Sequence, residues 1–312
     1  MGRALVRRVV LAAGVLILLN GAVFLAIRLV PGDPVRVALG EQLGDREVEA
    51  LRRELGLDRP LWEQLVRFAG GVLRGELGSS LRSGRPVADE VGRTLPVSVA
   101  LVATAVAVGG AAGTAAGWFS AARAGSRVDA LVSSSAAVAA SLPAYLVASV
   151  LLVVFAGRLR WFPSGGYDSW WHLVLPVTTL ALSEGAVVAR VSRAAIREVL
   201  HSDFVRTAAA KGLRAVRITL RHVLPNAMVP VVSLLAADFG RLVGGAVVIE
   251  SVFAVPGVGY LVVEAVRYRD YTVLQGAVLV LSAVSLLAGL AGDVAAAAID
   301  PRLRDGQGAG AR

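Results

Sequence analysis

Few side chains in this sequence could carry out covalent chemistry. The 312 residues contain no cysteine and only three histidines, His172, His201 and His222. Disulfides, cysteine-rich zinc sites and cysteine nucleophiles are therefore excluded. A membrane-bound enzyme would have to use His201, Asp203 and His222, but these residues fit a helix cap and its adjoining loop better. We expect no catalytic residue and no metal ligand.

The sequence also contains no motif for binding or hydrolysing a nucleotide. The phosphate-binding pattern G-x-x-x-x-G-K-[ST] does not occur, and Lys211 is the only lysine. That pattern supplies the backbone amides and the lysine that hold the phosphates of ATP. We therefore expect a chain that is not an enzyme and binds no cofactor of its own.

Three charged residues lie well inside long apolar stretches, and a fourth, Asp293, lies near the end of its stretch. An ionised side chain in hydrocarbon costs at least about 2.5 kcal/mol, so it usually faces a partner or a water-filled cavity. Asp238 and Arg241 are three residues apart, share one helix face and can pair. They could satisfy only each other or line a translocation pathway, and both readings stay open. Glu184 is a similar pathway candidate.

The elements that hold these residues are apolar helices. Hydrophobic residues make up 56% of the chain, which is more than one soluble core of this length could bury. About 20 apolar residues cross a bilayer as a helix. We expect an all-α polytopic membrane protein with six transmembrane helices, near residues 9–27, 94–122, 130–157, 172–189, 226–249 and 271–298.

The positions of the basic residues indicate the orientation. With the N-terminus in the cytoplasm, the four inside segments hold sixteen Lys and Arg, whereas the short outside loops hold four. Basic residues concentrate on the cytoplasmic side, so both termini are expected there. This bias accounts for most of the net charge of +9 and removes the reason to expect nucleic acid as a partner.

Glycine and proline patterns indicate how the helices pack. Gly109, Gly113 and Gly117 recur at four-residue spacing, which predicts close approach of another helix. Gly240 and Gly244 repeat this pattern, and contacts within the chain are favoured over contacts between subunits. Prolines are expected to bend two spans, at residues 143 and 176.

Two segments outside the spans have distinct compositions. Residues 31–95 mix charges with spaced apolar residues, which predicts short amphipathic helices on the outer surface. In residues 190–225, Ser202 and Asp203 can cap a helix over 204–211 that Gly212 ends. A second helix is expected over 213–224, stopping at Pro225. The chain shows no repeat or linker, so residues 1–312 are expected to form one membrane domain.

The loop at residues 190–225 resembles the E-A-A loop of ATP-binding-cassette (ABC) importer permeases. Residues 206–208, Gly212 and Leu224-Pro225 match its spacing, although its first Glu and Ala are replaced. The stretch from Asp203 to Leu213 is similar to D-Y-V-R-T-A-x-A-K-G-L of the dipeptide, oligopeptide and nickel permeases, with Phe204 for Tyr. Residues 28–34, 250–259 and 300–302 resemble further motifs of that family.

This resemblance implies a type I importer permease fold with a cytoplasmic coupling helix. The implied partners are a second, related permease, cytoplasmic ATPase subunits that hydrolyse ATP with Mg, an external substrate-binding protein and the lipid of the cell (inner) membrane. The residues implied to form the coupling helix and touch the ATPase are Asp203, Phe204, Arg206, Thr207, Ala208, Lys211, Gly212, Leu213, Leu224 and Pro225.

The cargo is not determined by these motifs. A wet, mildly charged cavity suits dipeptides or oligopeptides, which we favour over nickel or glutathione within the same importer class. A self-sufficient secondary transporter is the more distant alternative. Proteins of that class often contain two halves related as inverted repeats. No such pairing of halves is visible in the sequence.

Overall fold

A computed structural model of the chain describes residues 2–29, 35–36, 44–54 and 56–299. The motifs at residues 31–34 and 300–302 lie outside this part. The described elements are helices, and two of them, η1 and η2, are π-helical. They are α1 (Gly2–Leu29), α3 (Asp45–Glu54), α4 (Leu61–Leu73), α5 (Val87–Ala122), α6 (Arg127–Ser141), α7 (Ala144–Leu151), η1 (Leu152–Arg158), α8 (Trp171–Leu200), α9 (Asp203–Ala210), α10 (Ala215–Ile218), η2 (Thr219–Val223), α11 (Leu224–Val252), α12 (Val258–Arg267) and α13 (Tyr271–Ile299).

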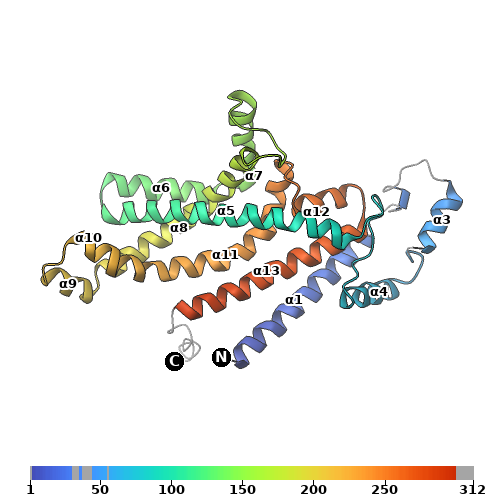
Figure 1. Cartoon of the computed structure of the whole chain (residues 1–312), viewed down its shortest axis with the longest axis horizontal. Coiled ribbons are helices and arrows are strands. Elements are labelled where there is room, and N and C mark those ends of the chain that lie inside the picture. Colours follow the sequence, from blue (N-terminus) through green and yellow to red (C-terminus); the bar gives the residue numbers. More distant parts are fainter. Residues whose placement is uncertain (1, 30–34, 37–43, 55, 300–312) are drawn as a thin grey trace.

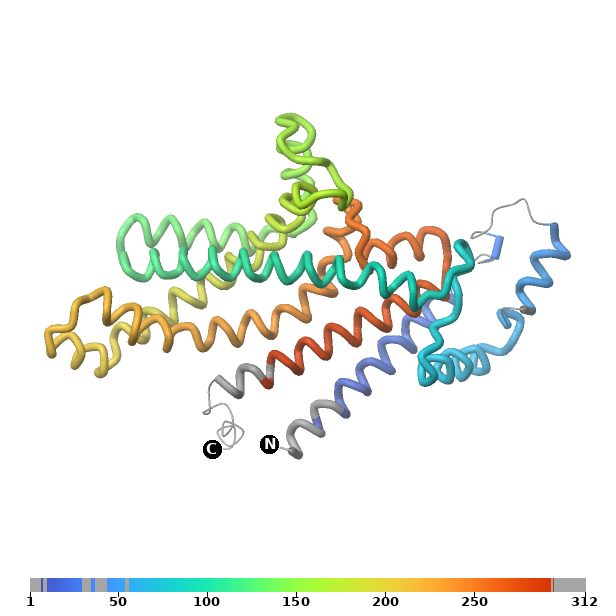
Figure 2. The backbone as a smooth tube through the Cα atoms, in the orientation of Figure 1, coloured from blue at the N-terminus to red at the C-terminus, as the bar shows by residue number. Residues whose placement is uncertain are grey.

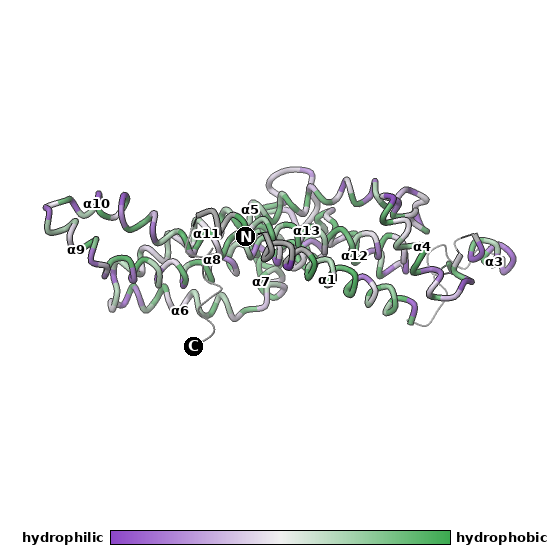
Figure 3. The backbone as a smooth tube through the Cα atoms, turned by 90° about the horizontal axis from the view of Figure 1, so that it is seen from below, coloured by the Kyte–Doolittle hydropathy of each residue, from purple (hydrophilic) through white to green (hydrophobic). Residues whose placement is uncertain are grey.

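The long helices form an elongated bundle with two different ends (Figures 1 and 2). Helices α9 and α10 lie at one end, which we call the α9 end, and α3, α4 and α12 lie at the other, which we call the α12 end. Helix α1 begins, and α13 stops, on the side of the α9 end. Apolar residues dominate the middle of the bundle and polar ones gather toward both ends (Figure 3), as a bilayer requires.

Five helical stretches of the described chain are long and apolar enough to cross a membrane, and the number is six if the bent pair of α6 with α7 and η1 counts as one span. The all-α, multi-spanning prediction is therefore confirmed. Several predicted boundaries are wrong, because α5 begins at Val87 rather than at residue 94 and α8 continues to Leu200 rather than ending near residue 189. Falling hydropathy marks where a helix leaves the hydrocarbon, whereas its backbone hydrogen bonds continue beyond that point.

The span expected over residues 130–157 is broken rather than gently bent. Helix α6 ends at Ser141, Pro143 caps the start of α7, and the two pieces meet at 100°. Proline disfavours the α conformation at the preceding residue, and Leu142 has an extended ψ of 130°. The second half of this pair projects from the bundle in Figure 1.

The helix predicted to stop at Pro225 instead runs on into α11 as part of one candidate span, Ala215–Val252. The π-helical segment η2 lies directly before Leu224 and Pro225. Proline has no N–H group and its ring clashes with the carbonyl four residues earlier, so a wider turn lets the helix pass this residue. A proline in a helical sequence therefore did not mark an end here.

The glycine face of α5 packs against α8 within the chain. A Cβ added at Gly109, Gly113 or Gly117 would lie 2.4–2.8 Å from a backbone oxygen of α8, which is too close for any side chain. The prediction of packing within the chain is confirmed for this face. In α11, Gly240 approaches Ser285 of α13 in the same way, whereas a Cβ at Gly244 would make only an ordinary contact, 3.8 Å from Ser285 Oγ.

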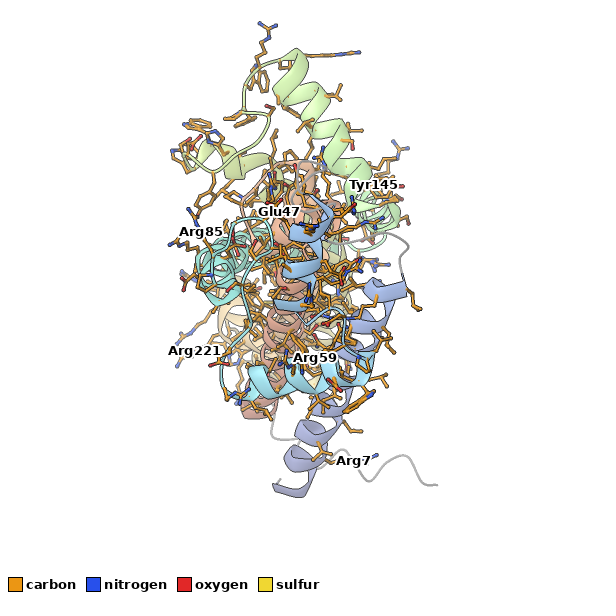
Figure 4. The ribbon with its side chains drawn as sticks, turned by 90° about the vertical axis from the view of Figure 1, so that its right-hand side faces the viewer. Arg7, Glu47, Arg59, Arg85, Tyr145 and Arg221 are labelled. Carbon is orange, nitrogen blue, oxygen red and sulfur yellow. The ribbon has the colours of Figure 1, made fainter. Side chains whose placement is uncertain are left out.

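The segment at residues 31–95 contains the expected short helices. Helices α3 and α4 stand at the α12 end, and Val48 of α3 is buried. Seen from this end, Glu47, Arg59 and Arg85 lie at the surface (Figure 4). This end of the protein therefore presents a charged surface.

Candidate functional site: the α9 element and the charged cluster

Helix α9 forms where the sequence predicts it, with bounds shifted by one residue. Ser202 occupies the N-cap position, but its hydroxyl donates to the Val199 carbonyl (2.5 Å) and makes no cap hydrogen bond. The predicted side-chain cap is therefore wrong in detail. Gly212 follows with φ +77°, and its N–H donates to the Ala209 carbonyl (2.9 Å), which closes the helix as expected.

The two faces of α9 have different surroundings. Val205 and Ala208 are buried in a small core with Ile196 of α8, Ile218 of α10 and Val223 of η2. The opposite face is exposed in the described part of the chain, and Phe204 on it is 47% exposed. This arrangement fixes α9 to the ends of α8 and α11, so that it can move with those two helices as one body.

The residues expected to contact an ATPase divide between these two faces. Ala208 points into the core of its own chain, and Leu213 and Leu224 are half-buried. The exposed members are Asp203, Phe204, Arg206, Thr207, Lys211, Gly212 and Pro225. A partner at the α9 end could therefore touch the exposed set, while the others hold α9 in place.

The three charged residues predicted inside the spans lie together in one cluster. Arg241 Nε donates to Asp238 Oδ1 (2.8 Å), which confirms the predicted pair within α11. Arg241 Nη2 also lies 3.5 Å from Oε2 of Glu184 on α8. The Glu184 side chain is fully buried and its Oε1 has no partner among the described residues, whereas the Arg241 side chain is 62% exposed. The cluster therefore joins a buried acid to an open surface.

The sequence did not single out an ion pair near the α9 end. Arg193 of α8 donates from Nε and Nη2 to the two oxygens of Asp129 in α6, at 2.6 and 2.8 Å. The Ser120 hydroxyl and the Gly125 N–H also donate to this carboxylate. Two charge-assisted bonds between a planar guanidinium and a carboxylate fix orientation well. Helices α5, α6 and α8 are thereby joined next to α9, and the only advance signal was a lone acid between basic residues.

Sequence comparisons identify the family. The model for "Binding-protein-dependent transport system inner membrane component" matches residues 113–305, and the model of the corresponding N-terminal region matches residues 1–102. The glutathione transport system permease protein GsiC of Escherichia coli O6:H1 (strain CFT073) is 38% identical over 289 residues, covering 93% of this chain and 94% of that protein. GsiC of Pectobacterium atrosepticum is 38% identical over 282 residues, covering 90% and 92%.

Solved structures agree on the fold. A chain of the inward-facing methionine ABC transporter MetNI aligns with a TM-score of 0.58 and 18% identity, covering 68% of this chain and 96% of that one. A chain of an amino acid ABC transporter crystallised with histidines aligns with a TM-score of 0.50 and 18% identity, covering 69% and 94%. The chain therefore belongs to the family of binding-protein-dependent transport system inner membrane components, as an ABC importer permease of the dipeptide, oligopeptide and nickel type with the type I fold.

Proposed function

We propose that this permease forms half of the import pathway for small peptides, a class that includes the tripeptide glutathione. The observation that carries this proposal is the 38% identity to glutathione permeases over 93% of the chain. Nickel is the weaker alternative, because the relatives reported above are named for glutathione. The preference for other peptides over glutathione has no support from these relatives.

The proposed assembly has four kinds of component. This chain pairs with a second, related permease, and each permease docks on an ATPase that hydrolyses ATP with Mg. The chain itself is the non-catalytic subunit, and an external binding protein delivers the peptide at the α12 end. The α9 end and both termini then face the cytoplasm, in agreement with the basic residues counted there.

Helix α9 is the proposed coupling helix. Its exposed face carries the aromatic ring of Phe204 and the guanidinium of Arg206, two side-chain types enriched at protein interfaces. Its buried face is continuous with the ends of α8 and α11. A push on α9 would therefore move both helices that hold the charged cluster, which is the mechanical connection an importer needs.

Removing the exposed face of α9 tests this docking. In Phe204→Ala/Arg206→Glu, co-purification of the ATPase with the permease is expected to fall at least about tenfold, because an aromatic anchor and a basic contact are lost together. Val216→Ala removes a comparably exposed side chain from α10 and should leave co-purification unchanged. Full recovery of the ATPase with the double variant would show that α9 is not its docking element.

Neutralising the charged pair tests the pathway and its cargo. We propose that Asp238, Arg241 and Glu184 line the pathway and orient the charged ends of a peptide. Asp238→Asn/Arg241→Gln should change the relative KM values of the reconstituted importer for glutathione and a neutral dipeptide by about fivefold or more, because a hydrogen bond to a charged group of the peptide is lost. Unchanged uptake kinetics would reduce the pair to a structural role, and a wild-type importer that carries nickel but no peptide would contradict the proposed cargo.

A further inference from the structure

The last turn of α11 contains a buried carboxylate that the proposed pathway does not use. Glu250 has no exposed surface, and it lies where the chain turns from α11 into the short helix α12. In Figure 1 this turn is at the α12 end, opposite the coupling helix. A buried acid at a turn needs hydrogen-bond donors nearby.

The first turn of α12 supplies one donor to Glu250 and one to Ser98. Glu250 Oε2 accepts from the Tyr260 N–H (3.1 Å), and the Val258 N–H donates to the hydroxyl of Ser98 on α5 (2.8 Å). The first N–H groups of any helix lack partners within the helix, and the N-cap Gly257 has no side chain to supply one. The cap of α12 is therefore built from side chains of two other helices.

Two glycines allow the carboxylate to come this close. A Cβ on Gly257 would lie 2.3 Å from Glu250 Oε2 and 2.5 Å from Ser98 Oγ. A Cβ on Gly259 would lie 2.9 Å from the same Oε2. Neither glycine has a positive φ, so their backbone conformation does not require glycine. Glycine is required at these two positions because the carboxylate packs so closely against them. Helices α5, α11 and α12 meet at this one point.

We propose that Glu250 and Ser98 form a releasable latch that holds α12 against α5 and closes the pathway at its outer end. This inference rests on the proposed orientation, in which the α12 end faces outward. Its physical basis is an incomplete set of hydrogen bonds, because Oε1 of Glu250 is buried without a partner among the described residues. When α12 moves away from α5, water can hydrogen-bond to this carboxylate oxygen. That hydration stabilises the open state and reduces its difference in free energy from the closed state.

The latch makes Glu250 a positioning residue, and accessibility of α12 is its direct measure. Because the chain contains no cysteine, a single Ala265→Cys reporter on the buried side of α12 can be labelled by a membrane-impermeant maleimide in the complete reconstituted importer. Adding loaded binding protein and ATP to the wild-type background should speed labelling. Glu250→Gln and Ser98→Ala should each speed labelling about tenfold without ligand, because a charge-assisted bond or a cap bond is lost.

Two controls separate a latch from general loosening. Ser192→Ala removes another buried serine hydroxyl, one without a partner among the described residues, and Glu63→Gln neutralises a partly exposed carboxylate on α4, away from the contact of α12 with α5. Both should label at the wild-type rate. The labelling rate of the double variant Glu250→Gln/Ser98→Ala should exceed that of either single variant by no more than about twofold, since both substitutions release the same contact.

The outcomes that overturn the latch differ from those that overturn the function. If wild-type labelling stays slow during turnover, the contact is a static tie and the latch is wrong, although uptake would still be observed. The latch is also wrong if the Glu250→Gln importer is stable and its labelling rate equals that of the wild type. Peptide uptake missing from the wild-type importer would instead reject the proposed cargo and leave the accessibility result interpretable.

Discussion

Replacing Gly212 with valine is expected to leave the permease in the membrane but to lower ligand-stimulated uptake at least about tenfold. Gly212 has a φ of +77°, a conformation that costs an L-residue roughly 1–2 kcal/mol and a β-branched residue more. A Cβ there would meet nothing within 4 Å, so the effect comes from the backbone alone. The strain would be relieved by re-orienting α9, and ATP hydrolysis would then no longer drive uptake. Parallel assays of uptake and ATPase activity measure this uncoupling.

Matched variants isolate the cause. Asn tolerates the left-handed conformation best among non-glycine residues, so Gly212→Asn should retain most uptake. Gly84→Val introduces the same strain, at φ +68° with no neighbour within 4 Å, but in a loop at the α12 end, and it should leave coupling intact. Normal uptake by Gly212→Val would count strongly against α9 as the coupling helix.

Replacing Gly113 with alanine is expected to destabilise the folded permease by about 1–3 kcal/mol, the usual effect of overpacking a tight contact. The added methyl would lie 2.4 Å from the Gly185 carbonyl oxygen and 2.8 Å from Val188 Cβ. Helices α5 and α8 would have to separate, and α8 holds both Glu184 and the approach to α9. We expect a lower melting temperature in detergent and reduced uptake.

The control for this prediction lies on the same helix. A methyl group at Gly92 of α5 would meet nothing within 4 Å. Gly92→Ala should therefore be neutral or stabilising by up to about 1 kcal/mol, because alanine is the better helix former. An unchanged melting temperature for Gly113→Ala would mean that the two helices tolerate wider spacing than the structure shows.

The charged cluster shows how far sequence reasoning could reach toward the site. The three-residue spacing was enough to pair Asp238 with Arg241, because both lie on one helix. Glu184 was recognised only as a separate acid, since it is on α8 and no spacing rule relates residues 57 positions apart. The same reason explains why the contact of Asp129 with Arg193 and the meeting of Glu250 with Ser98 were not foreseen.

The helix boundaries show a second limit. Proline at residue 143 ended a helix, whereas Pro225 lies within a span that a π-helical turn carries past it. A proline removes one hydrogen bond in either case, and the surrounding packing decides whether the chain breaks or widens. One residue type therefore allows two outcomes, and only the structure shows which of them occurs at each proline.

The membrane character, the family and the position of α9 could all be read from the sequence without the structure. Those properties follow from local features: the length of apolar runs, the distribution of arginine, and the glycine that must adopt a left-handed conformation at residue 212. Which charges meet, which face of α9 is free and how α12 is held against α5 became visible only in three dimensions. These depend on the relative placement of helices far apart in the chain, which is fixed by close packing rather than by any local preference.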